Sequence, residues 1–179
     1  GETFERCLAS LRDVVDEIGA HQWEKPALGE WTVRDLVGHT SRSLTALSSI
    51  LDNPGGSVDI SSPAQHYRVS LADKRIHATI AERGRQAGLE LGQNPAQVIH
   101  EASENVTRLM KGIAESTVVQ YNNGGITLAD YLATRVIEIA VHSLDLAKAL
   151  GLETKPSDEL LRFVLRLLAD LALDSDCGG

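Results

Sequence analysis

The segment RVIEIAVHSLDLAKALG, residues 135–151, limits the possible folds more than any other part of the chain. Its apolar residues recur with the period of a helix and cover well over half of the helix circumference. One narrow line along this helix is polar, and its members are spaced three, four and three residues apart: Arg135, Glu138, His142 and Asp145. A helix that is apolar on most sides must be packed on most sides, so the segment predicts a helix deep inside a bundle.

Capping signals and chain breakers divide the rest of the sequence into further helices. Thr32 followed by Asp35 has the spacing of a capping box, and Thr127 followed by Asp130 repeats it. Gly151 stands just after a helix end, where glycine is favoured. The pattern predicts four main helices, over 3–19, 33–51, 95–115 and 127–151, and one or two accessory helices, over 71–91 and 157–173.

The fold class follows from what lies between these helices and from composition. Residues 52–70 are rich in Ser, Pro, Gly and Asp and are predicted to form a long connection, which in a compact domain crosses the fold or lines a site. No stretch alternates as a strand does, and with 42% apolar but only 4% aromatic residues the composition favours helix-on-helix packing. We expect one all-α bundle domain over residues 1–175 and a short tail over 176–179.

Charge and cysteine content narrow the classes of partner. The formal net charge is −8 and no cluster of Lys and Arg offsets it, which argues against nucleic-acid binding. No apolar run approaches the roughly 20 residues of a membrane span, and the first residues lack a signal pattern. Cys7 and Cys177 show no motif spacing, as is typical of a reducing compartment. We expect a cytoplasmic protein with no membrane or nucleic-acid partner. The apolar segment 160–173 can cover a second copy of the chain or close its own core, so both a monomer and a homodimer are open.

The polar line contains a candidate metal site. Glu138 and His142 are one helical turn apart, so their Cβ atoms lie about 5–6 Å from each other and their side chains can share an ion. The alternative is a polar line that only faces water, as on any amphipathic helix. His39 is a third candidate ligand: if the two helices are antiparallel, His39 lies about 10 Å from its helix start and His142 about 12–14 Å from its helix end. That arrangement favours an up-down-down-up bundle, an order that the long connection permits.

The other polar and aromatic candidates receive structural interpretations. Four histidines lack partner spacing and are assigned to the surface or to loops: His21, His66, His77 and His100. Of these, His66 is the one loop candidate near the site. Trp31 is expected to pack as a hydrophobic staple at a helix start, and Tyr121 to belong to a plain turn rather than to the mouth of a site.

Two stretches of the sequence resemble a known family. GEWTVRDLVGHT (29–40) and EIAVHSLDLAKALG (138–151) are similar to the signature stretches of the mycothiol-dependent maleylpyruvate isomerases, within the DinB-like metal-binding four-helix bundles. The resemblance implies that His39, Glu138 and His142 hold a divalent metal, zinc first and nickel second. It also implies a small thiol such as mycothiol as co-substrate.

This resemblance suggests a reaction class. Two imidazoles and one carboxylate leave a coordination position open, and a metal there favours a bound thiolate over the thiol. We therefore expect a thiol transferase or thiol-assisted isomerase that acts on a small electrophile, with Asp145 and Arg135 as further catalytic candidates. Full isomerases of the family add a C-terminal domain that supplies an active-site arginine, and the residues after the last predicted helix leave no room for one. Maleylpyruvate isomerisation itself is therefore not expected of this chain.

Two other classes of function remain open at this stage. The bundle can bind a metal without catalysis, as a stress-linked binding or sensing module. It can also be a metal-free helical domain whose polar line faces water. A bound metal would distinguish the enzyme and the metal-binding module from the metal-free domain. Thiol binding to that metal would distinguish the enzyme from the module.

Overall fold

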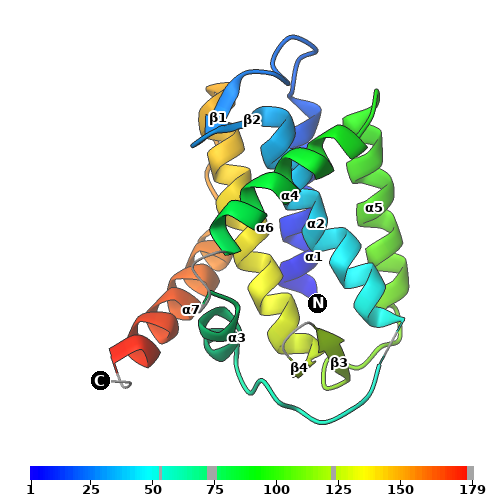
Figure 1. The fold of residues 1–179 in the computed structure, drawn as a ribbon, viewed down its shortest axis with the longest axis vertical. Coiled ribbons are helices and arrows are strands. Elements are labelled where there is room, and N and C mark those ends of the chain that lie inside the picture. The colour runs from blue at the N-terminus through cyan, green and yellow to red at the C-terminus, as the bar shows by residue number, and fades with distance from the viewer. Residues whose placement is uncertain (53, 72–75, 122–123, 177–179) are drawn as a thin grey trace.

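A computed structural model describes residues 1–52, 54–71, 76–121 and 124–176 of the chain. In the described part, helices dominate and two short hairpins accompany them (Figure 1). The helices are α1 (Glu2–Asp16), α2 (Val33–Leu51), α3 (Pro63–Leu71), α4 (Ile76–Glu90), α5 (Pro95–Met110), α6 (Leu128–Leu150) and α7 (Asp158–Asp176). The strands are β1 (Pro26–Leu28), β2 (Trp31–Thr32), β3 (Val118–Tyr121) and β4 (Gly124–Thr127). Of the predicted tail over 176–179, only Asp176 is among the described residues, and Cys177 is not.

Four long helices form the core of the molecule. α6 lies against α1 and α2, and α5 closes the other side against the same two helices. Figure 1 shows that α2 and α6 run in opposite directions, since α2 begins beside the β1–β2 hairpin and α6 begins beside β4. The core is aliphatic, as the composition predicted, and its fully buried side chains include Leu8, Leu11, Leu36, Leu44 and Ile139.

The predicted helix ends are confirmed by their hydrogen bonds. Thr32 Oγ1 accepts from the backbone N–H of Asp35 at 3.2 Å, and the Asp35 carboxylate accepts from the Thr32 N–H at 3.0 Å. Thr127 Oγ1 accepts from the N–H of Asp130 at 3.1 Å. Gly151 has a φ of +74°, the left-handed conformation expected of glycine after a helix. Local signals therefore located the ends of both helices that carry the polar candidates.

The prediction that the chain contains no strand is wrong. β1 pairs with β2 and β3 pairs with β4, both antiparallel. Each strand has four residues or fewer, which is too short for an alternating pattern to be recognised in the sequence. The predominantly helical fold is nonetheless as expected.

The predicted connection over residues 52–70 also needs correction, because its residues 63–70 are helical. α3 begins after Ser62, whose Oγ accepts from the N–H of Gln65 at 3.1 Å. The helix has nine residues and only a weak apolar stripe, so its periodicity does not stand out in the sequence. It lies against α6 and α7.

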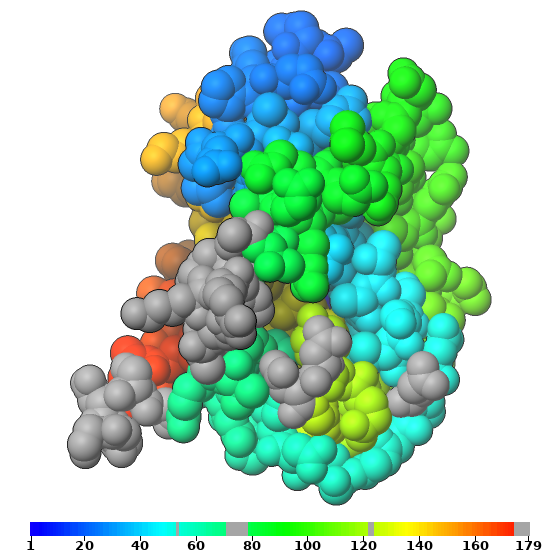
Figure 2. Space-filling model, viewed as in Figure 1, coloured from blue at the N-terminus to red at the C-terminus, as the bar shows by residue number. Residues whose placement is uncertain are grey.

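A glycine contact lets α4 cross α2 at very short range (Figure 1 and Figure 2). A Cβ atom on Gly38 of α2 would lie 2.2 Å from the backbone nitrogen of Gly88 on α4. A Cβ on Gly84 would lie 2.7 Å from the ring of Trp31. α4 therefore covers the N-terminal half of α2, the half that carries His39. In the described part of the chain, no helix is long and apolar enough to cross a lipid bilayer.

Candidate metal centre

The three predicted ligand residues lie together between α2 and α6. Nε2 of His39 is 3.7 Å from Oε2 of Glu138, and Nε2 of His142 is 3.8 Å from the same oxygen. The rings of His39 and His142 are perpendicular, with centroids 4.9 Å apart. One nitrogen or oxygen from each residue falls within 4.8 Å of the others, so the group can hold a metal ion.

Two features of the fold produce this convergence. Glu138 and His142 are one turn apart on α6, which places both side chains on the same face. His39 lies in the second turn of α2, and the opposite directions of α2 and α6 bring it to the level of His142. The side chains of His39, Glu138 and His142 are 17%, 26% and 15% exposed, so the cluster is mostly buried and still reached by solvent.

The donor set fits a divalent transition metal. Two ligands of one tetrahedral zinc ion lie about 3.4 Å apart, since each metal–ligand bond is about 2.0–2.2 Å long. The separations of 3.7 and 3.8 Å are close to that value. Imidazole nitrogens with one carboxylate suit zinc and nickel better than calcium or magnesium, which prefer oxygen ligands.

Neighbouring side chains orient two of these three residues. Asp145 places a carboxylate oxygen 3.2 Å from Nδ1 of His142. A proton on Nδ1 then points at Asp145, and Nε2 is left unprotonated, with a lone pair available to a metal ion. The hydroxyl of Tyr67 on α3 lies 3.2 Å from Oε1 of Glu138 and 3.0 Å from the carbonyl oxygen of Thr134. Tyr67 therefore holds the outer carboxylate oxygen while Oε2 faces the histidines.

The electrostatic environment keeps Glu138 ionised and His142 neutral. Burial by itself raises the pKa of Glu138, but the nearby His39 and the positive charge of Arg135 outweigh it, and this pKa falls to about 2. Burial and the neighbouring His39 lower the pKa of His142. An ionised carboxylate and a neutral His142 imidazole are in the protonation states that metal binding requires.

The ring of Trp31 packs against His39 in the candidate centre. The hydrophobic-staple role that we expected for Trp31 did not predict this contact. The ring centroid of Trp31 is 4.6 Å from that of His39, at an angle of 33°. The indole N–H donates to the carbonyl oxygen of Ala81 on α4 at 3.0 Å. Trp31 is therefore fixed from both sides and restricts the His39 ring.

Arg135 belongs to the polar line but does not form an ion pair with Glu138. Its guanidinium lies 5.1 Å from the ring centroid of Tyr131, and its Nε donates to Oγ1 of Thr134 at 3.1 Å. The structure thus separates two of the predicted catalytic candidates. Asp145 contacts His142, a candidate ligand, whereas Arg135 lies one turn before Glu138 along α6.

His66 is buried, and its assignment to the surface or to a loop is wrong. It lies in α3, is 2% exposed, and its ring is close to those of Tyr67, Tyr121 and Tyr131, with centroid distances of 5.9, 5.6 and 6.1 Å. Burial and the charge of Arg135 lower the pKa of His66 to about 4, so the ring is neutral. No local pattern marks this residue, because its partners come from three separate segments.

Two of the remaining histidines lie at the surface, as predicted. His100 is on the surface and lies 2.9 Å from Asp16, and His21 is exposed. The side chain of His77 lies outside the described residues.

The chain matches a known protein family. The family described as mycothiol maleylpyruvate isomerase N-terminal domain matches residues 4–147, a range that contains the three candidate ligands, Asp145 and Trp31. No curated protein and no solved structure matches the chain.

Proposed function

The chain belongs to the mycothiol maleylpyruvate isomerase N-terminal domain family, and from this membership we propose that it is a metal-dependent protein that uses a small thiol of the mycothiol type. In this proposal His39, Glu138 and His142 bind one divalent ion, zinc in the first place and nickel in the second. The observation that carries it is the convergence of one ligand atom from each of these residues within 4.8 Å.

The reaction we propose is attack of the thiol on a small electrophile, as a transferase or as a thiol-assisted isomerase. When bound, a divalent ion with an open coordination position supplies the positive charge that favours a thiolate at neutral pH. In a transfer, sulfur forms a bond to carbon, the leaving group departs with the electron pair, and the thiol proton passes to solvent. In an isomerisation, the thiol adds and is released again.

The residues around the ligands have separate roles in this proposal. Asp145 accepts a hydrogen bond from the Nδ1–H group of His142, which leaves Nε2 of His142 to bind the ion. Tyr67 fixes the carboxylate of Glu138 through Oε1. Arg135, one turn before Glu138, meets the negative charge of an anionic electrophile.

Three broader predictions belong to the same proposal. The bundle has the DinB-like up-down-down-up order, a view supported by the directions of α1, α2, α5 and α6 in Figure 1. Residues 1–175 act as one metal-binding domain. The protein works in the cytoplasm, as a monomer or homodimer.

Metal content and thiol binding together test the proposal. Elemental analysis of the purified protein should find about one zinc or nickel per chain, and a His142→Ala variant should lose most of it. The cobalt-substituted protein should then develop a sulfur-to-metal absorption band when mycothiol is added. Metal without a thiol band would leave a non-catalytic metal-binding module, and no metal after reconstitution would leave a metal-free bundle.

A further inference from the structure

The two histidines of the candidate metal centre are oriented in different ways. Nδ1 of His142 has a carboxylate oxygen of Asp145 at 3.2 Å. Nδ1 of His39 is buried and has no hydrogen-bond partner in the described part of the chain. A metal-binding histidine is usually fixed by a hydrogen bond to its second ring nitrogen. The ring of His39 must therefore be held in another way.

The ring of Trp31 packs on the ring of His39. Their centroids are 4.6 Å apart and the two planes are inclined by 33°, so the rings overlap more than they meet edge to face. Trp31 directly precedes the N-cap residue Thr32, and its ring reaches the second turn of α2, where His39 lies. The other ring beside His39 in the described ranges is that of His142, which is itself a candidate ligand. Packing by Trp31 is therefore the contact that can restrict His39 before an ion binds.

Trp31 is in turn immobilised by α4. Its indole N–H donates to the carbonyl oxygen of Ala81 at 3.0 Å. A Cβ atom on Gly84, one turn further along α4, would lie 2.7 Å from the indole ring, so the ring rests on the helix backbone where no side chain fits. One indole thus contacts both α4 and the imidazole of His39.

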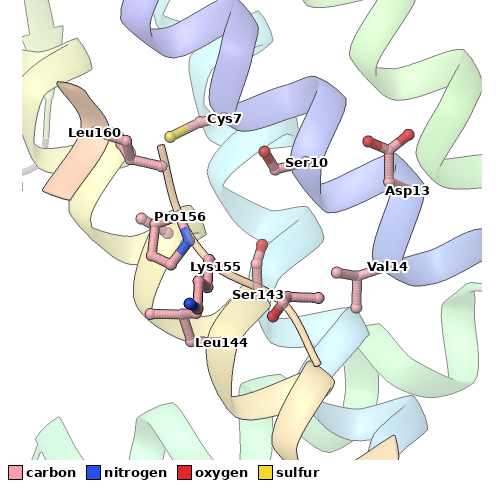
Figure 3. A pocket seen from close by; sticks show the side chains of 11 residues that line it. Cys7, Ser10, Asp13, Val14, Ser143, Leu144, Lys155, Pro156 and Leu160 are labelled. Carbon is pink, nitrogen blue, oxygen red and sulfur yellow. The ribbon is translucent and has the colours of Figure 1, made fainter. Parts of the chain in front are cut away.

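The hollow behind α6 is not part of this arrangement. It has a volume of about 250 Å³ and lies between α1, α6 and the segment that joins α6 to α7 (Figure 3). Its lining includes neither Asp145, Tyr67 nor Trp31. The contacts that orient the candidate ligands are therefore made on the other side of α6.

We propose that Trp31 is a positioning residue for His39 in metal binding. It restricts the imidazole by packing, whereas Asp145 restricts the imidazole of His142 by a hydrogen bond. α4 belongs to the same device, because it holds the indole through Ala81 and Gly84. This inference rests on the proposed function, since it requires His39 to bind the ion. It makes the affinity for metal depend on a side chain and a helix that supply no ligand.

Zinc affinity, measured in competition with a chelator, tests the role of the indole ring. Trp31→Leu keeps apolar bulk but removes the flat ring, and it should weaken zinc binding about tenfold, as loss of a group that orients a metal ligand does. Trp31→Phe keeps an aromatic ring and should stay within about threefold of the wild type. Trp23→Leu is the matched control, because Trp23 is a buried tryptophan that packs under Arg34, and it should leave zinc affinity unchanged.

A double variant separates positioning from a general loss of structure. In His39→Ala protein, where Glu138 and His142 remain, adding Trp31→Leu should leave the residual zinc affinity unchanged, because the residue through which Trp31 acts is gone. The visible absorption spectrum of cobalt-loaded protein reports the ligand geometry. It should change in Trp31→Leu and match the wild type in Trp23→Leu.

The contribution of α4 is tested at a position far from any ligand atom. Gly84→Ala places a methyl group against the indole and should weaken zinc binding about threefold. Gln86→Ala changes an exposed residue of the same helix and should leave zinc affinity unchanged.

Three results would overturn the inference, and they can be told apart. Equal zinc affinity in Trp31→Leu and the wild type would remove this role and leave the proposed metal site intact. A tenfold loss from Trp31→Leu that persists in His39→Ala protein would show that Trp31 supports the fold and not the ligand. No zinc binding by the wild type after reconstitution would overturn the proposed function, and this role with it.

Discussion

Removing one histidine from the candidate metal centre should abolish a measurable thermal stabilisation by zinc. His142→Ala deletes one of the three candidate ligands, and it leaves α6 with a good helix former at that position. His100→Ala is the matched control, because His100 is a surface histidine that pairs with Asp16 away from the centre. The two variants lose the same imidazole, and only one of them should lose the response to metal.

The size of the effect follows from mass action and chain length. A ligand that binds only the folded state stabilises it by about 2.7 kcal/mol at a concentration one hundred times its dissociation constant. For 179 residues the entropy of unfolding is about 0.4 kcal/mol/K. Zinc should therefore raise the Tm of the wild-type protein by about 7 °C. His100→Ala should show the same rise, and His142→Ala a rise of less than about 2 °C.

Differential scanning calorimetry of chelated protein, with and without added zinc and with thiols kept reduced, measures this directly. An equal rise in His142→Ala and wild type would refute the reasoning, because the ion would then be bound elsewhere. Loss of the rise in Tm in both variants would also refute the reasoning, since it would show that the stabilisation by zinc depends on surface histidines in general.

Three further predictions concern protonation, orientation and packing. In metal-free protein the pKa of Glu138 is about 2, against 4.5 for the unfolded chain. Its contribution of about 3 kcal/mol is therefore present above pH 4.5 and is lost as the pH falls toward 2. Between pH 6 and pH 3, urea unfolding should show a loss of about 2 kcal/mol in the wild type beyond any loss in Glu138→Gln. Asp145→Asn should weaken zinc binding about tenfold, measured in competition with a chelator, because an amide accepts the hydrogen bond from His142 Nδ1 less strongly than a carboxylate does. An unchanged affinity would show that Asp145 does not orient His142 for metal binding. Gly38→Ala should lower the free energy of unfolding by about 1–3 kcal/mol, measured by urea denaturation, since its Cβ would lie 2.2 Å from the backbone of Gly88. An unchanged free energy of unfolding would mean that α2 and α4 separate freely.

Several features of the centre were accessible from sequence because they depend on local geometry. The spacing of Glu138 and His142 is a property of a single helix, and it holds wherever that helix lies. The position of His39 needed one further assumption, that the two helices are antiparallel, and Figure 1 shows them so. The pairing of His142 with Asp145 follows the same one-turn rule.

Other features could not be read from the sequence because distant segments create them. Tyr67 and His66 occur in a stretch predicted to be a connection, and their roles depend on where α3 packs against α6. The sequence around Trp31 indicated a helix start, but it did not indicate the contact between Trp31 and His39. That contact depends on α4, which approaches through the glycine pair Gly38 and Gly88.

The sequence by itself determined the helical class, the helix ends at Thr32, Thr127 and Gly151, and the face of α6 that carries the polar line. These properties arise from hydrogen bonds and periodicity within a few residues, so they need no knowledge of the rest of the chain. Only the tertiary structure decided which side chains surround that line and what lies behind it. Burial and pKa are set by atoms that meet across segments distant in sequence, as the buried ring of His66, close to tyrosines of β3 and α6, illustrates.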